Sequence, residues 1–262
     1  MFYKLFLILI FMVITVNSSI AQNGIKTGDY KFSGNMPKLE EEYSQYNYEI
    51  DFKKEKFYIH VPENYSDAEK YGLLVFMNPS NAARSLPAGW AQVLKEKKLI
   101  FISPQNAGNS QASPRRIVLA VASVYKVKEV ASIDPSRIFI SGFSGGGRIA
   151  SIASFTHPSL FSGVIAICGV EYYKKVPRLR ATEKGPYGFY SMKKSLAEET
   201  KNEVKYCIIT GPNDFRYGNL LDIYNGGFKE DNHDVKLFVA KGMGHRICSG
   251  AILDRALSFI DG

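Results

Sequence analysis

Cysteine and histidine are scarce in this chain, whose 262 residues include three cysteines and four histidines. Zinc sites need several of these residues at short spacings, and Cys168, Cys207 and Cys248 fit no such pattern, so we expect no metal. The first two fall in apolar runs that predict adjacent buried strands, which favours free core thiols over a disulfide. Cys248 is close to His245 in the sequence and could line a pocket.

Motifs that bind nucleic acids are also lacking, although the formal net charge is +8. Much of the positive excess lies in one stretch, at Lys174, Lys175, Arg178, Arg180, Lys184, Lys193 and Lys194. A basic surface can attract an anionic polysaccharide, a cell envelope or a nucleic acid. Because no RNA- or DNA-binding motif accompanies the charge, we favour a solvated exterior and expect no nucleic-acid partner.

A long apolar run occurs only at the N-terminus, where Leu5–Val16 follows Lys4. The run is too short for a comfortable membrane span, and Ser18–Gln22 behind it offers the small residues that a signal peptidase reads. We predict that residues 1–21 are a cleaved signal peptide, that the protein is secreted or periplasmic, and that no stable membrane span remains after cleavage. A retained N-terminal anchor is the alternative.

The remaining sequence lacks internal repeats and low-complexity tracts. Residues 22–46 are polar and contain several glycines, which indicates an extended lead-in rather than a domain. In residues 47–262 strands alternate with helices, and this length suits one domain with a single core. We expect strands at 57–61, 73–77, 99–103, 137–141, 164–168, from 206 and at 235–240, and helices at 90–95, 113–131, 148–153 and 252–259. The alternation predicts an α/β fold with a mostly parallel central sheet and helices on both faces.

One excursion interrupts this alternation, between residues 169 and 204. It has room for a helix and a loop and is too short for a large lid domain. Its aromatic residues could form a rim at a pocket or pack on the core. They are Tyr172, Tyr173, Tyr187, Phe189 and Tyr190.

The segment Gly142-Phe143-Ser144-Gly145-Gly146 follows an apolar strand and precedes a stretch that can form a helix. Strand, tight turn and helix are the context of a nucleophile elbow, in which a serine on a strained backbone presents its hydroxyl above the sheet edge. The glycines leave room where a Cβ would collide with a neighbouring strand or helix. A plain glycine-rich turn is the alternative interpretation.

Two further residues follow strands in the order that a serine, an acid and a histidine take in an α/β-hydrolase triad. Asp214 ends the strand that begins at 206, and His245 follows the strand at 235–240. Open α/β sheets place such residues together at the carboxyl ends of their strands. Asp222 could substitute as the acid. The other histidines are placed less well: His60 lies inside a strand, His157 follows the elbow helix, and His233 precedes the last strand.

On these motifs the chain resembles the α/β-hydrolase superfamily, and within it the secreted polyhydroxybutyrate depolymerase and feruloyl esterase-like group. The likeness is carried by residues 58–65, 71–76, 133–144 and 157–164. It implies a secreted serine hydrolase without a cofactor, which cleaves small or polymeric carboxylic esters through an acyl-enzyme. The ester could be of a short-chain acyl, carbohydrate, hydroxycinnamoyl or polyester type. The alternatives are a peptidase or acyltransferase on the same triad, and a catalytically silent binding module of the cell envelope.

The oxyanion hole is where the sequence departs from this group. The N–H of Gly145 lies at a helix start, where backbone amides are unsatisfied, and is the first expected donor. Relatives carry His-Gly after the strand at 73–77, whereas this chain has Asn78-Pro79, and proline has no N–H. We expect the second donor to be the amide of Ser80 or the side chain of Asn78.

Three arginines follow the proposed triad residues closely: Arg148, Arg216 and Arg246. Guanidinium groups around one pocket would suit a substrate that bears a carboxylate. Ordinary surface salt bridges explain each arginine equally well, so both interpretations remain open.

Overall fold

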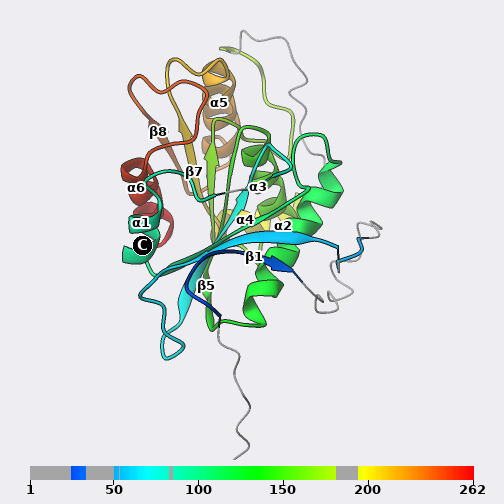
Figure 1. Ribbon diagram of the computed structural model, residues 1–262. Coiled ribbons are helices and arrows are strands. Elements are labelled where there is room, and N and C mark those ends of the chain that lie inside the picture. The colour runs from blue at the N-terminus through cyan, green and yellow to red at the C-terminus, as the bar shows by residue number, and fades with distance from the viewer. Residues whose placement is uncertain (1–24, 34–49, 53, 83–84, 181–193) are drawn as a thin grey trace, which may run out of the picture.

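The computed structural model describes residues 25–33, 50–52, 54–82, 85–180 and 194–262. The predicted signal peptide, most of the lead-in and three aromatic residues of the excursion lie outside these ranges. The described residues form an eight-stranded sheet in the order β1-β2-β4-β3-β5-β6-β7-β8 (Figure 1). The strands are β1 Gly28–Ser33, β2 Lys56–Val61, β3 Tyr71–Met77, β4 Leu99–Pro104, β5 Ile133–Phe143, β6 Gly163–Ile167, β7 Lys205–Thr210 and β8 Val235–Val239.

Strand direction divides the sheet into two parts. From β4 to β8 all neighbouring strands are parallel, whereas β1 and β2 run antiparallel at one edge. Parallel strands bring their carboxyl ends to one edge of the sheet, where ligands bind in open α/β folds. The predicted α/β-hydrolase architecture is therefore confirmed.

Strand β1 was not expected from the sequence, because it lies within the polar lead-in. It pairs with β2 along its whole length, from Gly28 opposite Val61 to Ser33 opposite Lys56. Asp29 of β1 accepts a hydrogen bond from Tyr58 and lies 2.9 Å from Nδ1 of His60. An edge strand needs only one paired side and little apolar surface, so the polar sequence of this segment did not predict a strand.

Helices cover both faces of the sheet, with α1 and α6 on one side and α2 and α3 on the other (Figure 1). Their bounds are α1 Ala91–Glu96, α2 Ser113–Lys128, α3 Gly145–Thr156, α4 Lys194–Glu203, α5 Tyr217–Ile223 and α6 Gly250–Ile260, with the π-helical segment η2 Tyr224–Lys229 directly after α5. Among the described helices, none combines the length and the apolar character that crossing a membrane requires.

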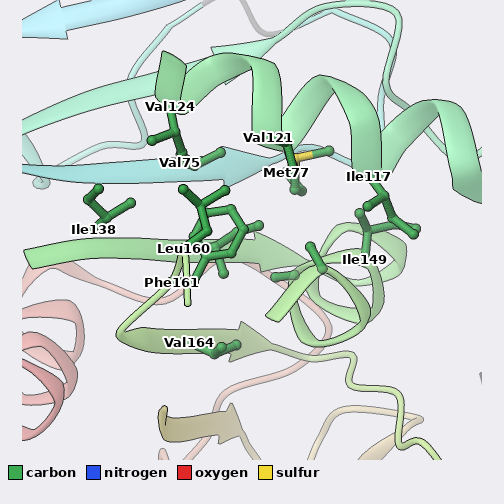
Figure 2. Packing of buried hydrophobic residues seen from close by; sticks show 14 of the residues in the cluster. Val75, Met77, Ile117, Val121, Val124, Ile138, Ile149, Leu160, Phe161 and Val164 are labelled. Carbon is green, nitrogen blue, oxygen red and sulfur yellow. The ribbon is translucent and has the colours of Figure 1, made fainter. Parts of the chain in front are cut away.

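Alternating residues of β3 enter two separate cores. Val75 and Met77 point toward α2 and pack with its residues Ile117 and Val121 (Figure 2). Phe76 points the other way and packs against Trp90 and the side of α1 and α6. Because successive strand residues face opposite sides, a continuous apolar run is what a doubly covered parallel strand requires.

The three cysteines are buried and free. Cys207 lies in β7 beside β6, and Cys168 directly follows β6, as the apolar runs predicted. Cys248 packs in the core under α1 and α6, where its carbonyl accepts a 3.0 Å hydrogen bond from Nε1 of Trp90.

Two aromatic residues of the excursion pack on the core. Tyr172 and Tyr173 surround Phe155 of α3, and both hydroxyls donate to Asp231. Of the two interpretations of these residues, core packing is the one that holds. Tyr187, Phe189 and Tyr190 lie outside the described residues.

Candidate active site

Ser144 occupies a sharp turn between β5 and α3, with φ 54° and ψ −120°. A non-glycine residue in this region is strained, and such strain is held only by well-packed surroundings. Here the Ser144 amide donates a 2.8 Å hydrogen bond to the carbonyl of Ile167 at the end of β6. The turn therefore has the geometry of the predicted nucleophile elbow.

The glycines around Ser144 are required by close backbone contacts. A Cβ on Gly142 would lie 2.3 Å from the backbone of Gly146, and a Cβ on Gly146 would lie 1.9 Å from the carbonyl oxygen of Met77. Both distances are far below van der Waals contact, so neither position tolerates a side chain without a backbone shift. This is the collision with a neighbouring strand and helix that the motif predicted.

Ser144, His245 and Asp214 form a continuous chain of contacts. Nε2 of His245 lies 2.9 Å from Oγ of Ser144, and Nδ1 lies 2.8 Å from Oδ1 of Asp214. Asp214 is buried and also accepts hydrogen bonds from the hydroxyl of Thr210 (3.1 Å) and the backbone N–H of Arg216 (3.0 Å). These bonds fix the carboxylate, which in turn orients the imidazole.

The loop that carries His245 is fastened to the loop that carries Asp214. Asn213 and Gly244 form a parallel bridge, and the amide of Asn213 donates to the carbonyl of Met243 (3.2 Å). The rings of Phe143 and Phe215 lie 5.0 and 4.3 Å from the imidazole, measured between ring centres. The imidazole thus contacts two aromatic rings, of which that of Phe215 is exposed, and is oriented by the buried carboxylate of Asp214.

The competing residues are engaged elsewhere. Asp222 accepts hydrogen bonds from the backbone amides of Leu179 and Arg180, so it tethers the chain after β6 rather than His245. Burial lowers the pKa of His157 and of His233 to about 4. The ring of His233 lies among the aromatic residues around Phe155, and that of His60 contacts Asp29 of β1.

A buried thiol lies behind the triad. Sγ of Cys168, His245 and Asp214 present ligand-type atoms within 4.8 Å of one another. Burial and the neighbouring carboxylate of Asp214 raise the pKa of the Cys168 thiol, so it stays protonated and lies 3.5 Å from the carbonyl of Arg246 as a donor. A metal would need the thiolate and the atoms that already bond within the triad, so these residues fit a hydrogen-bonded triad better than a metal site.

In the loop after β3, a hydrogen bond engages one of the two predicted oxyanion donors. The amide of Ser80 donates a 2.9 Å hydrogen bond to Oδ1 of Asn78, which closes a small turn around Pro79. The Ser80 amide, one of the two predicted donors, is therefore already used within the loop, and the Asn78 side chain is the other. The amide of Asn109, after β4, donates to the carbonyl of Pro79 (2.8 Å), and a Cβ on Gly145 would lie 2.1 Å from Oδ1 of Asn109. Asn109 thus lies against the residue after Ser144, which its place in a loop did not indicate.

Ser144 and Gly145 border a cavity of about 290 Å³. Among the predicted arginines, Arg148 and Arg216 line it, whereas Arg246 lines a different cavity beside Met243 and Cys248. Arg116 of α2 lines the Ser144 cavity as well, although no sequence motif indicated this. Its position in a helix that carries three other basic residues, Arg115, Lys126 and Lys128, gave no sign that its side chain turns inward.

Part of the sequence matches a known protein family. Residues 118–260, more than half of the chain, match the prolyl oligopeptidase family. No curated protein matches the sequence significantly.

Solved structures share the fold at low sequence identity. S-formylglutathione hydrolase (FrmB) from Staphylococcus aureus is 16% identical, with a TM-score of 0.62 over 79% of this chain and 93% of that one. Est1E from Butyrivibrio proteoclasticus is 15% identical, with a TM-score of 0.56 over 82% and 98%. A ferulic acid esterase is 15% identical, with a TM-score of 0.59 over 89% and 98%. The sequence match and the shared architecture together show that the chain belongs to the prolyl oligopeptidase family, within the α/β-hydrolase superfamily.

Proposed function

We propose that this protein is a serine hydrolase that cleaves carboxylic esters. The observation that carries the proposal is the unbroken contact from Ser144 through His245 to Asp214, at 2.9 and 2.8 Å, on a strained elbow. A serine hydroxyl is a weak nucleophile unless a base lies within hydrogen-bond distance, and a third group must orient that base. Both the base and the orienting group lie at these distances without any movement of the chain.

The reaction follows from these positions. Nε2 of His245 takes the Ser144 proton as Oγ attacks the ester carbonyl, and Asp214 stabilises the resulting imidazolium. The tetrahedral intermediate collapses as the imidazolium returns the proton to the leaving alcohol, which leaves an acyl group on Ser144. Water, deprotonated by the same imidazole, then attacks the acyl carbon and releases the acid, and the proton returns to Ser144.

The negative oxygen of the intermediate needs two donors. The amide of Gly145 is the first, because it lies at the N-terminus of α3 where helical amides lack an intrahelical partner. We place the second at Nδ2 of Asn78, since Oδ1 of that side chain is occupied by the Ser80 amide and the NH₂ group stays available to donate. The Ser80 amide could take over only if this turn opened.

A peptidase on the same triad is a second candidate, because the matched family is the prolyl oligopeptidase family. Short-chain, carbohydrate, hydroxycinnamoyl and polyester-type esters all remain within the main proposal. The two candidates separate in one comparison of kcat/KM on acyl 4-nitrophenyl esters and on peptide 4-nitroanilides. We expect turnover of the esters and none of the anilides.

Reaction with a fluorophosphonate probe tests the proposal directly. Such a probe forms a covalent bond only with an activated serine, so we expect the purified protein to be labelled and Ser144→Ala to abolish the labelling. Equal labelling of both proteins would show that Ser144 is not the nucleophile. A catalytically silent binding module would give no label on the wild-type protein.

Export is part of the same proposal. We infer that residues 1–21 are removed and that the hydrolase acts outside the cytoplasm, as the apolar run after Lys4 and the small residues behind it suggest. The intact mass of the protein from its native host should correspond to a chain that begins near Gln22. A mass that includes residues 1–21 would indicate an N-terminal anchor instead.

A further inference from the structure

The cavity beside Ser144 carries an unusual concentration of positive charge. Arg116, Arg148 and Arg216 all line it, and no carboxylate is among the described residues of its wall. The remaining lining is small and mixed: Asn109, Gln111, Ser113, Ser144, Gly145, Ile149 and Ile152. A volume of about 290 Å³ is at the lower end of small-molecule sites, so it suits a small ligand or one end of a larger one.

Arg116 is the residue that distinguishes this cavity from an ordinary surface. Arg116 is only 5% exposed, and its Nε donates a 2.7 Å hydrogen bond to the carbonyl of Ala107. Nη2 is buried and has no hydrogen-bond partner among the described residues. A buried guanidinium that lacks a carboxylate is costly, because its lost hydration is not replaced.

The neighbouring charges do not compensate Arg116. Arg148 is paired with the buried carboxylate of Glu171, to which its Nε donates at 2.6 Å. Burial, and then the charge of Arg148, lower the pKa of Arg116 to about 10, so the group remains charged at neutral pH. Its environment repels further cations and favours an anion.

We propose that this arginine cavity, defined by Arg116, Arg148 and Arg216, binds a carboxylate that the substrate carries in addition to its scissile ester. The inference rests on the proposed function and narrows its substrate class. Arg116 contributes an uncompensated positive charge to the wall of the cavity, and the carboxylate can accept a hydrogen bond from the exposed part of Arg148. Guanidinium groups bind carboxylates with paired, directional hydrogen bonds, which a neutral group of the same shape does not form.

The carboxylate could belong to the acyl part or to the alcohol part of the substrate, and two pairs of esters distinguish these sources. Monoethyl succinate and ethyl succinamate differ in charge on the acyl side. 4-Acetoxybenzoate and 4-acetoxybenzamide differ in charge on the alcohol side. For the pair whose geometry matches the cavity, we expect kcat/KM to be about ten-fold or more higher for the anionic member, as charge-assisted hydrogen bonds imply.

The variant Arg116→Gln should abolish this preference. The matched control is Arg255→Gln, which removes one exposed arginine on α6 and so changes the net charge equally. The readout is the ratio of kcat/KM for the anionic and neutral members, which a general loss of folded protein does not change. An unchanged ratio in Arg116→Gln, or a wild-type ratio near one for both pairs, would overturn the proposal.

A second measurement needs no change at Arg116 and no catalysis. Succinate should bind the Ser144→Ala protein in calorimetry, and succinamide should not. If the wild-type protein is not labelled by fluorophosphonate but succinate binds, the proposed function fails and the anion cavity stands. If the protein is labelled but neither binds succinate nor prefers anionic esters, the proposed function stands and the anion cavity fails.

Discussion

The two sides of Ser144 are built differently. On the side of β7 and β8, His245 is held by a buried carboxylate, by bonds between two loops and by two aromatic rings. On the side of β3 and β4, Asn78 is only partly buried, Ser80 and Asn109 are exposed, and Pro79 has no N–H to offer. Proton transfer is therefore supported by a buried carboxylate and by hydrogen bonds between two loops, whereas stabilisation of the oxyanion depends on a side chain in a surface turn.

The largest effects on activity are expected from substitutions on the side of β7 and β8. His245→Ala and Asp214→Asn should each lower kcat/KM on a short-chain ester by roughly three orders of magnitude or more, because base and orienting group act as a unit. His233→Ala is the control, since its ring lies in the aromatic cluster around Phe155. Steady-state hydrolysis of 4-nitrophenyl acetate measures all three. A steep loss in His233→Ala with little change in His245→Ala would reverse the assignment of the base.

Smaller effects on activity are expected from substitutions on the side of β3 and β4. Removal of one oxyanion donor typically lowers kcat on the order of a hundred-fold, and we expect this of Asn78→Asp, which keeps the acceptor of the turn but loses the NH₂ donor. Asn78→Ala loses the donor and also releases the Ser80 amide. If kcat falls in Asn78→Asp but persists in Asn78→Ala, the released amide serves as the donor.

This difference also marks what the sequence could predict. The elbow is a local pattern, since the strand, the glycines and the helix lie within about twenty residues, and Asp214 and His245 each follow a clear apolar strand. The hydrogen bond that occupies the Ser80 amide and the inward side chain of Arg116 depend on how individual side chains are oriented. No periodicity reports such orientations, so the sequence named Asn78, Arg148 and Arg216 as candidates but could not show that the Ser80 amide is used within its loop or that Arg116 lines the cavity.

The length of the acyl chain should also affect the rate of hydrolysis. A longer acyl chain gains about 0.8 kcal/mol per methylene only where an apolar wall receives it. The described wall of the Ser144 cavity includes three arginines, so we expect higher kcat/KM on acetyl to butyryl esters than on esters of about ten carbons. Rates measured across a series of 4-nitrophenyl esters, below and above the micellar threshold, test this. A steady rise with chain length, or a jump at the threshold, would reveal an apolar groove.

The smallest effect concerns acid stability at the far end of the elbow helix. His157 follows α3 directly, and burial lowers its pKa to about 4, below the value of about 6.5 in an unfolded chain. Between these two pH values the unfolded chain binds a proton at His157 that the folded protein does not bind. The contribution of His157 to the free energy of unfolding is therefore fully present above about pH 6.5 and is lost as the pH falls toward 4.

His157→Gln cannot take up this proton. Its melting temperature should therefore fall less than that of the wild type between pH 7 and pH 5, whatever its absolute stability at pH 7. His233, whose pKa is also lowered to about 4, keeps part of the dependence in this variant. Identical pH dependence in both proteins would mean that His157 is not protonated on unfolding in this range.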